Sequence, residues 1–299
     1  MAALTKPLER SRTARNRRLP WEIASYSLLG LLAVFFLFPI VFMLVSSLKS
    51  DEQQLLRDMS NLRAFVPYGS ISLENYASVF RRIPFLLGLF NSAFVVSLTV
   101  LMGLAVNSAI GYALARLRFP GRELLLTGVV ALIIIPFEAV AVPLLLLVNR
   151  LPWFGSSSWL DSYHVQIIPF VANAFSIYLF YQFFIGLPKE LEEAALVDGA
   201  SRWRIYTRIV LPLSGPVFAT VAILQFLARW GDLLWPVMVV RGDTFSTLPL
   251  LMQTFFGQQP RRWGEIMAFA TMTTVPILTL FLAFQRWFVQ SVASSGLKG

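Results

Sequence analysis

Long apolar stretches separated by short polar segments dominate this chain, and six of them are long enough to cross a membrane. About 20 helical residues span roughly 30 Å of hydrocarbon. The pattern predicts a membrane domain over residues 21–289 between two short polar tails. Its six spans are expected at residues 23–46, 86–114, 124–148, 165–185, 211–229 and 266–285. We therefore expect an all-α integral membrane protein.

The polar interruptions within these stretches restrict the interpretation. The apolar run over 211–240 is broken from Arg229 to Asp232, and the eight apolar residues that follow are too few to cross alone. Glu138 is the one acidic residue deep in an apolar stretch, where a charge costs about 2.5–3.5 kcal/mol at the bilayer centre. We expect Glu138, between Pro136 and Pro143, to line a pathway or to accompany a kink.

Composition supports the membrane assignment and excludes several other classes. The chain is 57% hydrophobic and only 14% charged, more apolar than one soluble core of this length requires. Its net charge of +9 is dispersed between apolar stretches, which does not favour nucleic-acid binding. The absence of cysteine excludes disulfides, zinc-thiolate sites and thiol catalysis.

The distribution of basic residues predicts the orientation. Four segments hold 15 of the 25 Lys and Arg residues, and they alternate with the predicted spans so that all four share one side. By the positive-inside rule that side is the cytoplasm, and both termini lie there. The segments are the tail at 1–20, the loops at 115–123 and 186–212, and the C-terminal end at 286–299, whose tail is 290–299.

The cytoplasmic loop 187–212 has the sequence of two short helices. Pro188 suits the first position of a helix, acidic residues occupy its first turns, and Gly199 suits a left-handed residue after its end. Ser201 is an expected N-cap for a second helix that ends near Leu211 and Pro212. Such a pair either lies on the membrane surface or docks into another protein. Small side chains at Ala194 and Ala195 permit close approach by a partner.

The residues of this loop resemble a known motif. Glu193-Ala194-Ala195, Asp198-Gly199 and then Ile209, Leu211 and Pro212 are similar to the EAA motif of ABC import permeases, which seats in a cleft of the ATPase subunit. Trp230-Gly231-Asp232 departs from the usual Trp-Asn-Asp of the family. Further strings resemble the carbohydrate permeases of the maltose-transporter type, in particular the six-span MalG-like subunit: Asn75-Tyr76, Asn91-Ser92, Tyr112-Ala113-Leu114-Ala115-Arg116, Trp235-Pro236 and Lys298-Gly299.

The resemblance implies a type I ABC importer permease fold and a set of partners. These are an ABC ATPase dimer that holds ATP and Mg, a second permease of the MalF-like type, an extracytoplasmic solute-binding protein and membrane lipid. It implies no catalytic residue, metal or cofactor on this chain, and a location in a bacterial or archaeal cytoplasmic membrane. The implied ATPase-coupling residues are Glu193, Ala194, Ala195, Asp198, Gly199, Leu211 and Pro212.

Two further groups of residues are candidates for contact with a partner protein or with the solute. The loop 241–265 on the opposite side is expected to be exposed and irregular, and either contacts the binding protein or only connects two spans. Its candidate contact residues are Phe255, Phe256, Gly257, Gln258 and Gln259. The candidate pathway residues are Glu138, Asn173, Trp230 and Asp232.

The expected function is ATP-driven import of a sugar, an oligosaccharide or a polyol-type solute. Import of a glycerol phosphate by a permease of the same family is an alternative. A stand-alone secondary transporter would show paired repeats or charges distributed through the spans, and neither is visible. The sequence has no G-x-x-x-x-G-K-[ST] phosphate loop and no nucleophile-base cluster, so the chain is not expected to be an enzyme.

Overall fold

The computed structural model describes residues 6–296, with side chains for residues 21–283. Every regular element in the described part is helical, which confirms the all-α class. The chain forms two compact units, one from residues up to 79 together with 262–271, the other from 80–261 together with residues from 272 onward.

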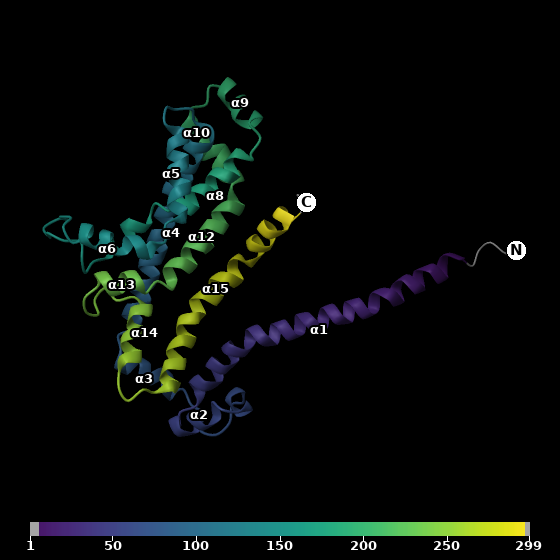
Figure 1. The fold of residues 1–299 in the computed structure, drawn as a ribbon, viewed down its shortest axis with the longest axis vertical. Helices are drawn as coiled ribbons and strands as arrows, with labels where there is room; N and C mark the ends of the chain where they lie inside the picture. Colours follow the sequence, from purple (N-terminus) through teal and green to yellow (C-terminus); the bar gives the residue numbers. More distant parts are fainter. Residues whose placement is uncertain (1–5, 297–299) are drawn as a thin grey trace. The chain divides into compact units, whose positions relative to one another are not determined.

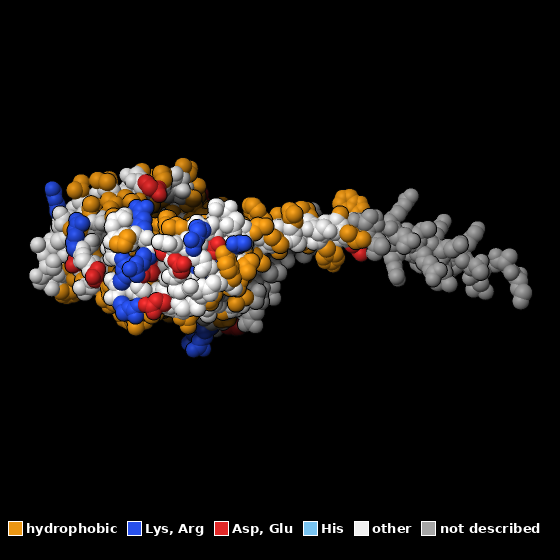
Figure 2. Space-filling model, turned by 90° about the horizontal axis from the view of Figure 1, so that it is seen from below, with side chains coloured by type: hydrophobic (Ala, Val, Ile, Leu, Met, Phe, Trp, Pro, Cys, Tyr) orange, Lys and Arg blue, Asp and Glu red, His pale blue; other side chains and the backbone are white. Residues whose placement is uncertain are grey.

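The first unit contains a long apolar helix. Residues 21–48 of α1 form a candidate span in which only 6% of the most apolar window is buried. Figure 2 shows hydrophobic side chains around this helix next to the grey N-terminal atoms. A helix that is apolar on all sides and exposed suits contact with lipid or another membrane helix. The unit comprises α1 (Lys6–Leu48), α2 (Glu52–Asp58), η1 (Leu62–Phe65), most of α3 (Glu74–Arg82) and the start of α15 (Trp263–Gly296).

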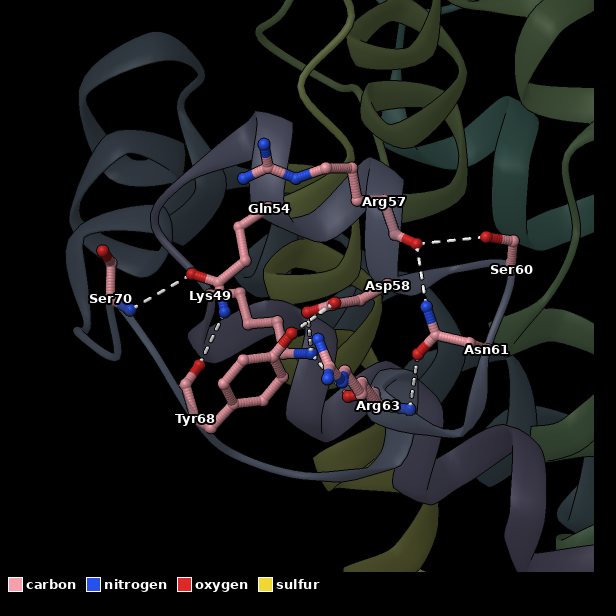
Figure 3. Close-up of polar contacts among 9 residues, drawn as sticks. All are labelled: Lys49, Gln54, Arg57, Asp58, Ser60, Asn61, Arg63, Tyr68 and Ser70. Carbon is pink, nitrogen blue, oxygen red and sulfur yellow. Dashed lines mark hydrogen bonds and ion pairs between the residues drawn. The ribbon is translucent and has the colours of Figure 1, made fainter.

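A buried ion pair holds the polar segment that follows α1. Lys49 Nζ lies 2.8 Å from Asp58 Oδ2 and donates to the Arg63 carbonyl at 2.7 Å, and its side chain is fully buried. The Tyr68 hydroxyl donates to the other oxygen of the same carboxylate. Figure 3 shows Lys49 and Tyr68 converging on Asp58, with Gln54 bonded to the Tyr68 carbonyl. These contacts fix residues 49–70 as one folded cap.

The pKa values of this cluster predict a pH range for the cap. The hydrogen bond from Lys49 lowers the pKa of Asp58 below 3.8, so its stabilisation is complete above that value and is lost as the pH falls through the lower pKa of the folded state. The bond to Asp58 raises the pKa of Tyr68 above 10.0, so its stabilisation is lost at higher pH. We expect amide protection over residues 50–70 to be greatest between about pH 4 and 10. Hydrogen exchange with mass spectrometry measures this protection. In an Asp58→Asn variant, which has no carboxyl group to titrate, the protection should no longer fall at acid pH. Equal protection in both proteins at every pH would contradict the assignment.

The second unit contains most of the remaining helices. Figure 1 shows α4, α8 and α12 running together, with α9 and α10 at one end and α14 at the opposite end. The helices of the two candidate contact regions, α9 and α14, therefore lie at opposite ends of this unit (Figure 1). Its elements are α4 (Phe85–Arg116), α5 (Arg122–Ile134), α6 (Phe137–Val148), α7 (Tyr163–Ile167), η2 (Ile168–Phe170), α8 (Ala174–Ile185), α9 (Glu190–Val197), α10 (Arg202–Ile205), η3 (Tyr206–Val210), α11 (Leu211–Leu213), α12 (Gly215–Trp230), α13 (Leu234–Val239), α14 (Leu248–Gly257) and the rest of α15.

Among the described residues, four helices are long and apolar enough to cross a membrane, or up to six if each of two bent pairs is one span. The region of the span expected at 124–148 contains α5 and α6, which are bent by 106° relative to each other. Pro136 explains the break, because a residue before proline avoids the helical region and Ile135 is extended. The second bent pair joins Arg202–Leu213 to α12 at 78°.

The loop 241–265 is more ordered than the sequence predicts. It contains α14, whose Leu248, Leu251 and Phe255 are buried. Gly88 of α4 makes room for this packing, since a Cβ there would lie 2.3 Å from Leu251 Cδ1. The expectation of an irregular, exposed loop was wrong because the apolar side chains of α14 recur at helical spacing and cover α4.

Candidate coupling site

The site is built around α9, which carries the EAA-like residues. Its start has Glu190, Glu192 and Glu193 in the first turn, where the helix dipole favours anions. Its end is closed by Gly199, whose φ of +76° confirms the predicted left-handed residue. The Ala200 amide then donates to the Ala195 carbonyl at 2.9 Å. Ser201 caps α10 by accepting from the Arg204 amide at 3.3 Å, as expected.

A buried carboxylate on the inner side of α9 connects it to α4. Glu192 Oε1 lies 3.1 Å from Arg116 Nε, and the two side chains are only 8% and 5% exposed. The Tyr112 hydroxyl donates to Glu192 Oε2 at 3.2 Å. Arg202, half exposed, adds a longer ion pair at 3.7 Å. Glu192 therefore anchors α9 to the last turn of α4.

Arg116 also holds the connection between α8 and α9. One of its terminal nitrogens donates to the carbonyl oxygens of Phe184 and Leu187, both at 2.5 Å. These carbonyls lie at the end of α8 and in the turn before α9. A guanidinium has five N–H donors in a rigid plane, so one side chain fixes both the backbone of the turn and the Glu192 carboxylate. The geometry of the α8–α9 turn thus depends on Arg116.

The helices after α9 pack into the same cluster. Tyr206 begins the π-helical turn η3, and its hydroxyl shares a 2.7 Å hydrogen bond with Ser108 of α4. Its ring lies 5.0 Å from that of Tyr112. Ile205 and Val210 are buried with them, whereas Trp203 is 71% exposed.

The outer side of α9 is a mixed apolar and charged surface. Glu193, Ala194, Asp198 and Gly199 are exposed there, and Val197 is 88% exposed. The other predicted coupling residues lie differently: Ala195 and Leu211 pack against the buried cluster, and Pro212 is exposed.

A cavity of about 770 Å³ adjoins this surface, and basic side chains predominate among its charged residues: Arg116, Arg118, Arg122, Lys189 and Arg202 beside Glu192 and Glu193. A large polar recess next to exposed apolar side chains suits a protein partner.

Glu192 and Arg116 were not among the predicted site residues. In sequence, Glu192 is one of three acidic residues in a first turn and nothing distinguishes it from Glu193. The available signal was the pair Tyr112 and Arg116, which lie four residues apart and therefore on one face of α4 at its cytoplasmic end. Two such donors beside the loop 187–212 require an acceptor, and the acidic residues of that loop are Glu190, Glu192, Glu193 and Asp198.

The candidate binding-protein contacts divide into inward and outward residues. Phe255 is only 4% exposed, and the Arg82 guanidinium lies 5.0 Å from its ring. Arg82 also donates to Gln258 Oε1 at 2.8 Å. Gly257 and Gln259 are exposed, and Phe256 is half-buried. Phe255 therefore packs inside the loop, whereas the other predicted contact residues are partly or fully exposed.

The candidate pathway residues lie in different surroundings. Glu138 is exposed in the first turn of α6 and pairs with no other described residue. Trp230 is buried and its indole donates to the Thr273 carbonyl at 3.3 Å, so it has a packing role. Asp232 pairs with Arg229 at 2.9 Å. Asn173 lines a cavity together with Arg229, which is the ion-pair partner of Asp232. Two of the four candidates, Asn173 and Asp232, therefore lie near each other.

Comparisons with known proteins identify the family. Residues 107–294 match the model of the binding-protein-dependent transport system inner membrane component. The chain is 33% identical over 283 residues to the arabinooligosaccharides transport system permease protein AraQ of Halalkalibacterium halodurans, covering 94% of this chain and 97% of that protein. It is 32% identical over 276 residues to the trehalose/maltose transport system permease protein MalG of Thermococcus litoralis, covering 90% and 94%.

Solved structures support the fold. A crystal structure of a bacterial ABC transporter involved in the import of the acidic polysaccharide alginate contains a chain that superposes with a TM-score of 0.79. The two chains are 22% identical, and the match covers 91% of this chain and 98% of the other. The chain therefore belongs to the family of binding-protein-dependent transport system inner membrane components, as a multi-pass permease subunit of the sugar ABC importers, in which ATP hydrolysis takes place on a separate subunit.

Proposed function

We propose that this chain translocates a sugar, an oligosaccharide or a polyol-type solute in an ATP-driven importer of the cytoplasmic membrane, with both of its termini in the cytoplasm. The named relatives transport arabino-oligosaccharides and trehalose or maltose, and another, at 29% identity over 283 residues, transports lactose. A glycerol 3-phosphate permease of Yersinia enterocolitica is 31% identical over 284 residues, so that phosphate ester is the second candidate solute.

The observation that carries the proposal is the two-sided construction of α9. Glu192 ties its inner side to α4 through a buried ion pair, while Glu193, Val197 and Asp198 face outward. A helix held rigidly from within and exposed on the other side suits transmission of a partner's movement. The partner is an ABC ATPase dimer, which binds ATP and Mg, and this chain carries no cofactor of its own.

The opposite end of the second unit, at α14, is the proposed contact with the solute-binding protein. Figure 1 shows α14 and α9 at opposite ends of α4, so the two partners would bind on opposite membrane faces. A second solved assembly of the alginate transporter, in complex with its pentasaccharide-bound periplasmic protein, matches this chain with a TM-score of 0.61 and supports the arrangement at the level of the fold. A second permease of the MalF-like type completes the pathway.

The test is hydrolysis and uptake by the purified complex. The complex is isolated through a tag on this chain and reconstituted in liposomes, and ATP hydrolysis is measured with the binding protein and a panel of lactose, maltose, trehalose and glycerol 3-phosphate. Stimulation by the binding protein with one solute supports the proposal and identifies the cargo. Purification without an ATPase, with uptake driven by an ion gradient, would refute it and favour a secondary transporter.

The α14 loop gives a further prediction. Replacing Gly257 and Gln259 by bulky charged residues should reduce binding-protein-stimulated hydrolysis several-fold, because both are exposed at the proposed contact. Phe255→Ala should destabilise the complex by about 3–5 kcal/mol, because it removes a buried ring. Thermal stability and stimulated hydrolysis separate the two effects. Normal stimulation in the Gly257 and Gln259 variants would show that another surface binds the partner.

A further inference from the structure

A cavity of about 180 Å³ opens between α4, α8 and α12, away from the coupling surface. Thr99 of α4, Asn173 and Ser176 at the start of α8, and Gln225 and Arg229 of α12 line it. Thr99 lies about midway along the 32 residues of α4. Because α4 is a candidate span, the cavity lies near mid-depth of the membrane.

The helix that borders this cavity is interrupted at that depth. The candidate span Tyr163–Ile185 consists of α7, the 3-10 turn η2 and α8, with a non-helical segment at 171–173. Irregular backbone at membrane depth is tolerated only where protein covers it or where it lines a polar cavity. Asn107 of α4 covers part of it, donating to the Val171 carbonyl at 3.0 Å and accepting from the Asn173 amide at 2.9 Å. The side chain of Asn173 remains at the cavity.

Unused hydrogen-bonding groups line this space. Asn173 Oδ1 caps α8 by accepting from the Ser176 amide at 2.9 Å, whereas its Nδ2 bonds to no described residue. The Arg229 guanidinium has Asp232 as its only described acceptor and stacks on the Phe170 ring at 3.8 Å. Most of its five N–H donors are thus available. Fixed donors of this kind suit the hydroxyl oxygens of a solute.

The charge and size of the cavity restrict the solute. Asp232 pairs with Arg229 and neutralises its charge, and Arg229 is the one charged side chain among the described residues that line the cavity. Its volume is about 180 Å³. The rings of Phe170 and Phe175 supply apolar contact beside the polar groups. The cavity therefore matches one ring of a neutral sugar better than an anion or a whole oligosaccharide.

Building on the proposed function, we propose that this cavity is a solute-contact site contributed by this chain, at which Asn173 and Arg229 donate hydrogen bonds to the hydroxyl oxygens of one ring of a neutral carbohydrate as it crosses. The second permease would close the open side. Asp232 acts as a positioning residue, because it holds the guanidinium beside the cavity and removes its net charge.

Filling the cavity tests this proposal. Ala228 lines the cavity and is exposed, so Ala228→Phe adds volume there without disturbing a packed core. Ala105→Phe, at an exposed alanine of α4 that lines none of the described cavities, is the matched control. Asn173→Asp is a second variant that keeps the cap of α8 and removes the Nδ2 donor. Uptake of labelled lactose, maltose, trehalose and glycerol 3-phosphate is measured in liposomes together with ATP hydrolysis.

We expect a neutral sugar to be the transported probe. Its uptake should fall at least tenfold in Ala228→Phe and Asn173→Asp, while subunit copurification and binding-protein-stimulated hydrolysis stay within twofold. Uptake within twofold of wild type, or a parallel fall of hydrolysis and uptake in both variants, would overturn the proposal. Preference of the wild-type complex for glycerol 3-phosphate would also overturn it while leaving the importer function intact. The proposed function fails by a different result, which is absence of both ATP-dependent uptake and stimulated hydrolysis in the wild type.

Discussion

Glu192→Ala is expected to abolish binding-protein-stimulated ATP hydrolysis in the assembled complex. The substitution leaves the Arg116 guanidinium, 95% buried, without its carboxylate partner, and the Tyr112 hydroxyl loses its acceptor. Removing one member of a buried ion pair costs about 3–5 kcal/mol, because the remaining charge stays uncompensated. That cost exceeds the energy that holds an eight-residue helix in place on its own. We therefore expect α9 to leave its position against α4.

The measurement compares four variants in the same liposome assay. Glu192→Ala should reduce stimulated hydrolysis more than tenfold, and Glu192→Gln should have a smaller effect because the amide still accepts from Tyr112. Arg202→Ala should be mild, because its ion pair is longer and half exposed. Glu190→Ala is the control, an exposed carboxylate in the same first turn. Equal hydrolysis in Glu192→Ala and Glu190→Ala would show that the buried pair has no part in coupling.

The sequence was sufficient for the all-α class, for the presence of several helices apolar enough to cross a membrane, and for the ends of α9. Apolar length predicts a span almost independently of its neighbours, because lipid imposes the same requirement on every helix. The left-handed Gly199 and the cap at Ser201 were also predictable, since both depend on residues within one turn. Such local chemistry is visible in a sequence.

Properties that depend on residues distant in the sequence were not predictable. The pairing of Glu192 with Arg116 joins residues 76 positions apart, and nothing local distinguishes Glu192 from Glu193. The burial of Phe255 depends on its contact with Arg82 across the second unit. The 106° bend at Pro136 was only partly predictable, because proline marks the break whereas the angle is set by what each half packs against.

The close approach of α4 and α8 depends on a glycine at position 111. These two helices make the most extensive contact between elements of the second unit, and Gly111 lies within it. A Cβ added at Gly111 would lie 2.6 Å from Phe180 Cβ and 3.0 Å from the Tyr181 amide nitrogen. Neither atom is the end of a flexible chain, so the helices must separate. Membrane helices commonly use small residues for such contacts.

We expect Gly111→Ala to destabilise the complex by about 1–3 kcal/mol, the usual cost of overpacking, and Gly111→Val by more. Gly103→Ala should be milder, because its new Cβ would meet the flexible amide of Gln225. Gly128→Ala is the matched control, since a Cβ there meets no described atom within 4 Å and alanine favours a helix over glycine. The temperature at which half of the purified complex aggregates should follow this order.

The same substitution should also impair coupling. Phe184 follows Phe180 by one turn of α8, and its carbonyl accepts one of the two hydrogen bonds by which Arg116 holds the turn before α9. Separation of α4 from α8 at Gly111 would lengthen that hydrogen bond and shift Arg116, which would weaken its ion pair with Glu192. Gly111→Ala should therefore lower stimulated hydrolysis several-fold even at temperatures where the complex stays assembled, whereas Gly128→Ala should not. Normal hydrolysis together with lowered thermal stability would separate the packing of α4 and α8 from the coupling site, and would require that Arg116 hold α9 without the support of α8.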